Sequence, residues 1–378
     1  MGKVPKSSDF ARARRTAMLC IALATALMGG ACGGGGGGTA APAGLAAGVQ
    51  GAQTIAVQGL AGRVIVGYQG WFGCPGDFRA NEHWFHWFNG DPAPNTLAVE
   101  MLPALDGFQE KDLCDTGLRR ADGSAVRVFS SQNPRIVARH IEWMRDHGID
   151  GAAVQRFVIE TRNAVMRARQ DNVLDLVRRN AERLQRVFYV TYDISGDQED
   201  VADAIRRDWS ALVKDSRITA SPAYLHVGGK PVVQLWGFGF RDRPGSAESA
   251  HSLIADLRGG ALGPPATVIG GVPSLWRSLG RDSKSDPAWA DVYRSFDILS
   301  PWLVGRFNSP WAADEYATTV MAEDRVEARR YGIGYLPVVF PGFSWHNLMA
   351  TRGVAVPMDQ IPRYCGEFLW RQLANTAP

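Results

Sequence analysis

The sequence predicts an α/β protein with the architecture of a (β/α)8 barrel of the TIM type. Short apolar runs rich in β-branched residues alternate with amphipathic helical patterns from about residue 62 to residue 373. The short runs are mostly apolar rather than alternating, as expected of parallel strands buried on both faces. Polar and aromatic residues follow the ends of these runs, where barrels carry their functional groups. An open parallel α/β sheet is the alternative.

The strands are predicted from short β-branched and apolar runs. A long aromatic loop follows the first of them, up to about residue 131, and a hairpin turning at Gly228-Gly229 leads into the fourth. The expected strands are residues 64–68, 152–157, 187–192, 231–235, 267–270, 296–299 and 335–340.

The helices are predicted from apolar residues at helical spacing. In the first helix Asn133-Pro134 is a start signal and Gly148 a stop signal. The expected helices are residues 133–147, 163–184, 201–212, 251–257, 311–330 and 361–373. After the last of them the sequence runs out at residues 374–378 without an eighth strand. We therefore expect a barrel whose first and seventh strands have unpaired edges, unless the sequence contains an earlier strand that its residue pattern does not reveal.

The first 31 residues have the pattern of an export signal. A basic segment leads into an apolar run over residues 16–28, which is too short to span a bilayer, and then into Gly29-Gly30-Ala31-Cys32. This resembles a bacterial lipoprotein signal, in which cleavage leaves Cys32 lipidated; ordinary secretory cleavage near Ala31 is the alternative. The sequence thus predicts a signal peptide over residues 1–31, a flexible tether rich in glycine and alanine over residues 32–61, and the barrel over residues 62–378. The protein would be exported and lipid-anchored in the bacterial cell envelope, or else secreted.

Charge and motifs exclude several functions. The net charge of +3 comes from the basic export signal, so no excess charge remains to attract nucleic acid, and a membrane partner is expected only through the lipid anchor. The sequence has no zinc motif, phosphate-binding loop or dinucleotide fingerprint, and we predict no metal and no cofactor. In an oxidising compartment Cys74 and Cys114 are candidates for a disulfide, which leaves Cys365 as an odd cysteine expected to be buried.

Aromatic and hydrogen-bonding residues gather at the predicted strand ends. Such a mixture suits a sugar, because an indole stacks on the apolar face of a pyranose while polar groups bind its hydroxyls. Packing in the core or in loops is the alternative for each residue. The candidate binding residues are Tyr68, Gln69, Trp71, His86, Trp87, Gln155, Arg156, Tyr192, Trp236, Trp302, Trp345, His346 and Asn347.

Glycosidase chemistry needs two carboxyl groups across the scissile bond. Asp193 is the best catalytic candidate in the sequence, followed by Glu110 and Asp106 in the first loop. A structural hydrogen bond at the end of its strand is the alternative role for Asp193.

Several motifs together resemble bacterial proteins similar to glycoside hydrolase families 71 and 99, which are often named xylosidase/arabinosidase. The resemblance covers about residues 62 to 373. It is carried by Gly67-Tyr68-Gln69-Gly70-Trp71-Phe72, Pro75-Gly76-Asp77, Trp84-Phe85-His86-Trp87-Phe88, Gly148-Ile149-Asp150-Gly151, Gln155-Arg156-Phe157, Tyr192-Asp193-Ile194-Ser195-Gly196, Gly229-Lys230-Pro231-Val232-Val233, Trp236-Gly237-Phe238-Gly239 and Pro341-Gly342-Phe343-Ser344-Trp345-His346-Asn347. It implies a (β/α)8 barrel that acts on glycosides.

The sequence departs from these families in two places. It has Glu100-Met101-Leu102-Pro103-Ala104 where relatives carry an Asp-Met-Trp-Pro-Asp-like run. Relatives also follow their last helix with a strand ending in Glu-x-x-Glu, whose two carboxylates are the catalytic pair in family 99. Neither carboxylate can be placed here, so we expect a C-terminally truncated, catalytically impaired glycoside hydrolase-like protein. A non-catalytic surface glycan-binding lipoprotein and a truncation product without function are the alternatives.

Overall fold

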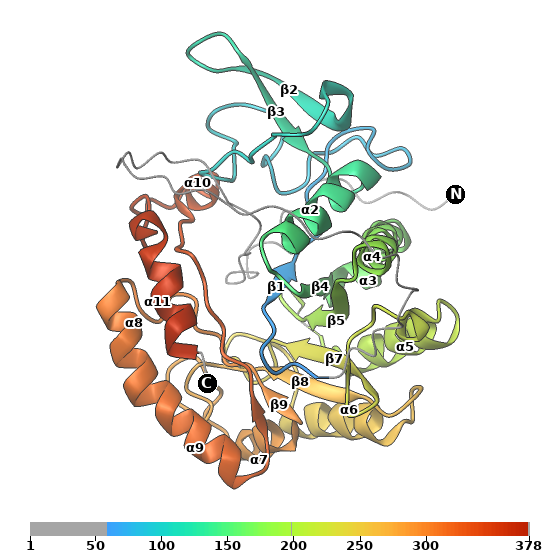
Figure 1. Cartoon of the computed structure of the whole chain (residues 1–378), viewed down its shortest axis with the longest axis vertical. Coiled ribbons are helices and arrows are strands. Elements are labelled where there is room, and N and C mark those ends of the chain that lie inside the picture. The colour runs from blue at the N-terminus through green and yellow to red at the C-terminus, as the bar shows by residue number, and fades with distance from the viewer. Residues whose placement is uncertain (1–58, 198, 377–378) are drawn as a thin grey trace, which may run out of the picture.

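The structure is a computed structural model that describes residues 59–197 and 199–376. Its centre is a curled sheet of parallel strands with helices packed around the outside (Figure 1). The parallel strands lie in the order β1, β4, β5, β7, β8, β9 and β10. Their bounds are Ile65–Tyr68, Gly151–Phe157, Val187–Asp193, Lys230–Trp236, Thr267–Gly271, Ile298–Leu299 and Gly334–Tyr335. The predicted TIM-type barrel that lacks closure is thus confirmed.

The main helices follow the predicted alternation. Helix α2 begins where the sequence indicated, since the Asn133 side chain accepts a hydrogen bond from the Arg135 amide and Pro134 occupies the first turn. The helices are α2 (Pro134–Asp146), α3 (Val158–Thr161), α4 (Ala164–Leu184), α5 (Ala202–Lys214), α6 (Ala247–Gly259), α7 (Ala288–Ser295), α8 (Pro310–Tyr316), α9 (Ala322–Arg330), α10 (His346–Ala350) and α11 (Glu367–Thr376). A π-helical turn, Ala317–Met321, joins α8 to α9.

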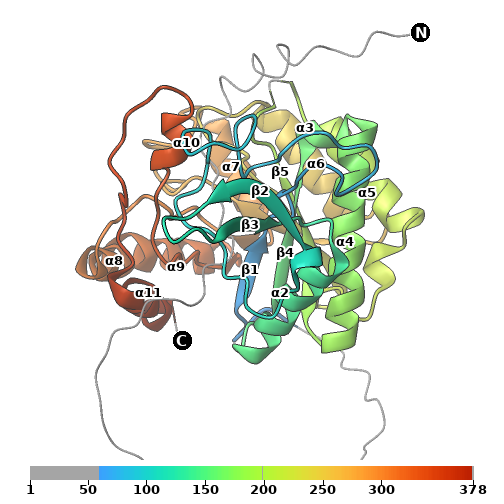
Figure 2. The ribbon, with the colours of Figure 1, turned by 90° about the horizontal axis from the view of Figure 1, so that it is seen from above.

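The long first loop contains a hairpin that the sequence analysis missed. Strand β2 (Leu113–Arg119) pairs antiparallel with β3 (Ala125–Phe129). The signal was present in the Asp122-Gly123 turn and in the alternation around Val126 and Val128. Figure 2, viewed from the top of Figure 1, shows this hairpin in front of the barrel.

Among the described residues, the sheet is open between β1 and β10, because these strands pair only with β4 and β9. The loops that follow the two edge strands meet instead. Asn347 donates from its backbone amide to Glu100 Oε1 at 2.8 Å and from its side chain to the Val99 carbonyl at 2.7 Å. The Asn89 side chain donates to the Thr351 carbonyl at 3.3 Å. Loop contacts therefore connect the two sides of the opening where no strand does.

The seventh strand is shorter than the predicted 335–340, because only Gly334–Tyr335 joins the ladder. Further along, the side-chain amide of Gln372 on α11 donates to the Phe340 carbonyl at 2.8 Å and accepts from the Phe340 amide at 3.1 Å. Gln372 and Phe340 are both buried. One side chain thus occupies both hydrogen-bonding groups that a neighbouring strand would use.

Two cysteine expectations have different outcomes. The disulfide between Cys74 and Cys114 is present and ties the loop after β1 to β2. The expectation that Cys365 is buried is wrong, because Cys365 is exposed. It lies on the turn that precedes α11, with a φ of 50°. The predicted signal peptide, the lipidation site Cys32 and residues 32–58 of the tether lie outside the described residues. Within the described part, no helix combines the length and apolar character needed to cross a membrane.

Candidate functional site

The sheet register sorts the predicted site residues onto two faces. Aligned residues of neighbouring parallel strands point to the same face, and successive residues of one strand point to opposite faces. Phe157, Asp193 and Trp236 are aligned across β4, β5 and β7, and Arg156 is aligned with Tyr192. The first group faces the barrel interior, whereas the second faces the helices.

Three predicted binding residues are buried on the helix side, which corrects their assignment. Arg156 is 1% exposed and binds both carboxylate oxygens of Asp208 on α5, at 2.9 and 2.6 Å. The Tyr192 hydroxyl donates to the same carboxylate at 2.7 Å. The Tyr68 hydroxyl lies 3.0 Å from Nδ1 of His140 on α2, and burial lowers the pKa of His140 to about 4. These residues hold helices to the sheet and cannot contact a sugar at the barrel mouth.

Four further candidates lie in the loops or at the start of helix α10. Trp87 is buried and donates from Nε1 to the Phe129 carbonyl at 2.7 Å, so it belongs to the packing beneath the hairpin rather than to a binding surface. Trp345 is half-buried against Phe343, with ring centroids 5.6 Å apart. His346 Nδ1 lies 2.6 Å from the Val356 carbonyl, and Asn347 forms the loop bridge already described.

The two secondary carboxylate candidates also lie in the first loop. Glu110 forms an exposed ion pair with Arg127 of β3 at 2.6 Å, and Asp106 is exposed shortly before it. Glu110 therefore braces the hairpin.

Asp193 lies at the end of β5, on the interior face, and is completely buried. One of its carboxylate oxygens accepts a hydrogen bond from the Ser195 amide at 2.7 Å, and the other accepts one from the Gln155 side chain. Burial raises the pKa of Asp193 to about 6, although these hydrogen bonds and the charge of Arg243 oppose the rise. The carboxyl group thus makes the structural hydrogen bonds that were the alternative to a catalytic role, and its pKa is close to neutrality.

Aromatic rings form two walls beside Asp193. On one side Trp71 is stacked with His86, at a centroid distance of 4.1 Å, and with Phe157, at 5.2 Å. On the other side Trp236 meets Trp302 edge to face at 5.2 Å.

Three buried polar atoms at this mouth have no hydrogen-bond partner within the described structure. They are Gln69 Oε1, Trp71 Nε1 and Trp236 Nε1. Gln69 and Trp71 directly follow β1, and Trp236 ends β7. Leaving such an atom unpaired destabilises a protein by about 1–3 kcal/mol, so each of the three atoms needs a partner such as a water molecule or a ligand hydroxyl group.

A narrow cavity beside the Trp71 stack brings predicted and unpredicted residues together. Its lining includes the predicted Trp71, His86 and Gln155 and also Glu160 and Arg169, which were not among the predicted site residues. Its volume of about 20 Å³ is room for one water molecule rather than a sugar ring. Glu160 on α3 accepts a hydrogen bond from the Gln170 side chain at 2.6 Å. Its position three residues after β4 was the available sequence signal.

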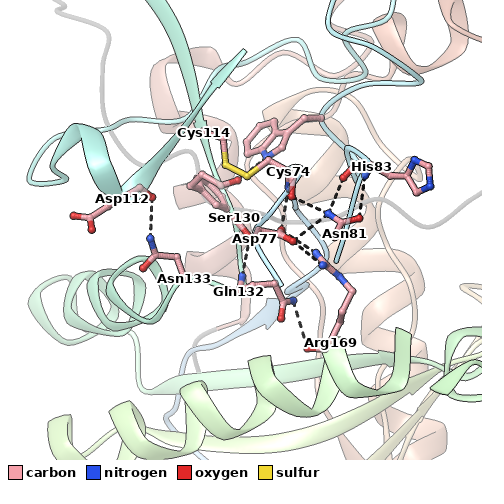
Figure 3. The surroundings of a disulfide bond; sticks show 12 residues. Cys74, Asp77, Asn81, His83, Asp112, Cys114, Ser130, Gln132, Asn133 and Arg169 are labelled. Carbon is pink, nitrogen blue, oxygen red and sulfur yellow. Dashed lines mark hydrogen bonds and ion pairs between the residues drawn. A yellow bond between two sulfur atoms is a disulfide. The ribbon is translucent and has the colours of Figure 1, made fainter. Parts of the chain in front are cut away.

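Asp77 and Arg169 anchor the loop that carries Trp71 and His86. The two residues form a buried bidentate ion pair, with N–O distances of 2.7 and 3.0 Å. Figure 3 shows Arg169 reaching from α4 toward Asp77, next to the Cys74–Cys114 disulfide. Burial alone would raise the pKa of Asp77, but hydrogen bonds from Arg169 and Ser130 and the charge of Arg169 hold it below its usual value.

The described residues offer no other obvious centre. No cluster of histidine, cysteine, aspartate and glutamate among them could hold a metal ion. A hollow of about 410 Å³ lies beside α8, and its lining of Gly305, Arg306, Phe307, Asn308, Ala312, Glu315, Tyr316 and Thr319 includes none of the predicted site residues.

Comparison with known proteins supports the fold. No family model and no curated protein matches the chain. A GH99 endo-alpha-mannosidase from Bacteroides thetaiotaomicron, solved with Bis-Tris-propane, superposes with a TM-score of 0.53 at 14% identity, covering 83% of this chain and 80% of the mannosidase. A second structure of a GH99 endo-alpha-mannosidase from the same organism gives a TM-score of 0.51 at 14% identity, covering 83% of this chain and 82% of the other. The chain thus shares the fold of these glycoside hydrolases.

Proposed function

We propose that this protein acts on glycosides and binds an oligosaccharide across the carboxyl ends of its strands. The unpaired Gln69 Oε1, Trp71 Nε1 and Trp236 Nε1 carry this proposal. A sugar hydroxyl both donates and accepts hydrogen bonds, so hydroxyl groups of a bound sugar can pair with an amide oxygen as well as with an indole nitrogen. Nearby rings, including the half-buried Trp302 and the exposed His86, supply apolar surface for the sugar faces.

The finer identity of the sugar is part of the same proposal. The resemblance of the sequence motifs favours xylosides and arabinosides, whereas the two superposed proteins are named endo-alpha-mannosidases. A panel of xylo-, arabino- and α-manno-oligosaccharides therefore covers the substrates that these two observations suggest.

We further propose that hydrolysis is slow, so that the protein acts mainly as a glycan binder. Hydrolysis of a glycoside uses two carboxyl groups that flank the scissile bond. Asp193 is fully buried and its two oxygens are occupied by Ser195 and Gln155. Release of products from aryl glycosides at a rate typical of glycosidases would contradict this part of the proposal.

Replacement of Trp236 by Phe tests the binding site. Trp236→Phe keeps a ring but removes the unpaired Nε1, and we expect sugar affinity to fall about five- to tenfold in isothermal titration, the loss expected for one hydrogen bond. Trp209→Phe is the matched control, since Trp209 is fully buried on α5 away from the strand ends. If no sugar of the panel binds the native protein, or if both variants bind it equally, the proposed site is wrong.

We also propose that the protein is exported and held to a bacterial envelope by a lipid on Cys32. The basic and apolar residues before Cys32 support this proposal. Expression in a bacterium with labelled fatty acid should label the native chain and not Cys32→Ala. An unlabelled native chain in the medium would favour simple secretion instead.

A further inference from the structure

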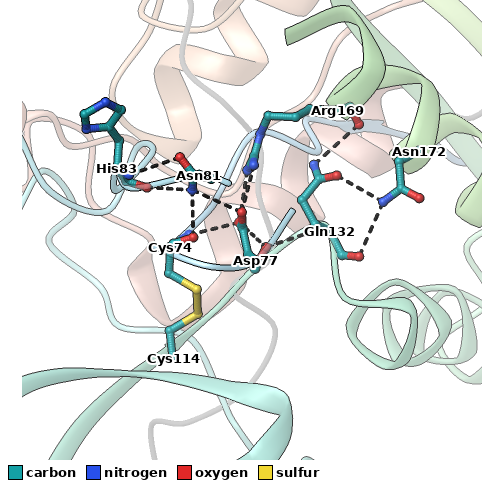
Figure 4. Close-up of polar contacts among 9 residues, drawn as sticks. Cys74, Asp77, Asn81, His83, Cys114, Gln132, Arg169 and Asn172 are labelled. Atoms are coloured by element: carbon teal, nitrogen blue, oxygen red, sulfur yellow. Dashed lines mark hydrogen bonds and ion pairs between the residues drawn. A yellow bond between two sulfur atoms is a disulfide. The ribbon is translucent and has the colours of Figure 1, made fainter. Parts of the chain in front are cut away.

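The Asp77 carboxylate makes polar contacts with several segments of the chain. Besides the two bonds from Arg169, its carboxylate accepts hydrogen bonds from Ser130 Oγ at 2.6 Å, from the Cys74 amide at 3.0 Å and from the Asn81 side chain at 3.1 Å. Figure 4 shows Arg169, Cys74 and Asn81 converging on Asp77, and Figure 3 also shows Ser130. The carboxylate therefore joins the loop after β1, the segment after β3 and helix α4.

The same ion pair touches the loop beside the Trp71–His86 stack. The Arg169 guanidinium lies over the ring of Phe85, 4.5 Å from its centroid. It also packs so closely on Gly73 that a Cβ atom there would lie 2.4 Å from Nη2. Gly73 and Phe85 are themselves paired through two backbone hydrogen bonds, at 3.2 and 3.0 Å. Arg169 thus rests on the backbone pair that brackets the loop between Trp71 and His86.

His86 needs such a support because its backbone is strained. Its φ of 59° lies in the left-handed region, which non-glycine residues seldom adopt and which persists only when the surroundings enforce it. His86 directly follows Phe85, and its ring is held 13° from parallel to Trp71. Trp71 carries one of the unpaired atoms of the proposed sugar site.

Stability alone does not account for a buried ion pair. Desolvation of two charges offsets much of their attraction, and well-packed apolar replacements are often as stable. What a bidentate arginine–carboxylate pair adds is a defined geometry, because the planar guanidinium fixes the orientation of its partner.

We propose that Asp77 and Arg169 are positioning residues that set the Trp71–His86 stack in the orientation required to bind a sugar. This inference rests on the proposed glycan-binding function. The ion pair does not contact the ligand through its charges; it acts through Gly73 and Phe85 on the loop that carries the two stacked rings.

Replacement of Arg169 by Lys tests the inference. The lysine keeps the positive charge beside Asp77 but loses the planar fork and its stacking on Phe85. Arg277→Lys is the matched control, because Arg277 contacts the buried Asp324 at 2.7 Å on α9, outside the barrel. We expect Arg169→Lys to bind sugar about five- to tenfold more weakly than the native protein, and Arg277→Lys to bind it equally well.

A second measurement needs no ligand. Stacking on Trp71 should shift the ring-proton resonances of His86 upfield, and His86→Gln assigns these resonances. We expect the shift to shrink in Arg169→Lys and to persist in Arg277→Lys. Retention of the full shift and of native affinity in Arg169→Lys would overturn the inference.

A gentler variant covers the case in which Arg169→Lys does not fold. Ser130→Ala removes one hydrogen bond from Asp77 and should change the His86 shift and the affinity in the same direction by a smaller amount. If neither quantity changes, the inference fails. If no sugar binds the native protein but the chemical shift of the His86 ring still depends on Arg169, the glycan-binding proposal is wrong, whereas the role of Arg169 in positioning the Trp71–His86 stack is retained.

Discussion

Asp193 should make the stability of this protein depend on pH in an unusual direction. Its pKa rises from 3.8 to about 6 in the folded protein because the carboxyl group is buried. The folded state therefore holds its proton over a range in which the unfolded chain has released it. Stability from this group is fully present below pH 3.8 and is lost as pH rises through about 6.

The magnitude follows from the size of the pKa shift. A shift of about two units, at about 1.4 kcal/mol per unit, gives about 3 kcal/mol of lost stability once Asp193 is ionised. Asp193→Asn removes the ionisation. Its amide oxygen can still accept from the Ser195 backbone, and its amino group can donate to the Gln155 side chain after that amide turns over.

Urea unfolding of the native protein and of Asp193→Asn between pH 4 and pH 8 measures the effect. We expect Asp193→Asn to be more stable by up to about 3 kcal/mol at pH 7, with the advantage shrinking toward pH 4. If the stability difference between the two proteins is the same at every pH, or if it increases toward low pH, burial does not control the pKa of this carboxyl group.

Three further predictions use the same unfolding assay. His140 has the opposite effect, because its pKa is lowered to about 4, so that about 3 kcal/mol of stability is lost as pH falls from 6.5 toward 4. His140→Gln should reduce this loss of stability at low pH. An equal loss in the variant would show that His140 is not its source. A Cys74→Ser, Cys114→Ser variant, which lacks the disulfide, should have a free energy of unfolding about 4 kcal/mol below that of the native protein, because the unfolded chain gains the entropy of a loop with a sequence separation of 40. If a reductant does not lower the free energy of unfolding of the native protein, the loss in the variant has another origin. Gln372→Leu should lower it by about 1–3 kcal/mol, because both backbone groups of Phe340 lose their partner; an unaffected variant would mean that water replaces the amide at no net free-energy change.

The opening between β1 and β10 gives the loops that follow these two strands a structural role. Asn347 donates two hydrogen bonds to residues 99 and 100, so the predicted binding residue supports the rim of the mouth. Asn347 is a predicted binding residue because it follows the seventh predicted strand. Its partners lie about 250 positions earlier in the chain, and only the folded structure brings them together.

The order of the parallel strands and of the longer helices could be predicted from the sequence, because burial of a helix stripe or of a strand requires apolar residues at a spacing that is visible locally. The shorter helices α3, α7 and α10 were not predicted. The carboxyl ends of the first six predicted strands could be placed to within one residue, and with them Gln155, Asp193 and Trp236 at the mouth. The hairpin β2–β3 is harder to predict, because turn residues and short alternation are also typical of a loop.

The direction of each strand-end side chain was decided by the tertiary structure. Strands buried on both faces have no polar alternation, so nothing local distinguishes Gln155, which faces the barrel, from Arg156, which faces α5. The support of the stack is also non-local, since Asp77 and Arg169 are separated by 92 positions. A sequence shows which residues can pair or stack; only the packing of helix α4 against the first loop determines that these two do.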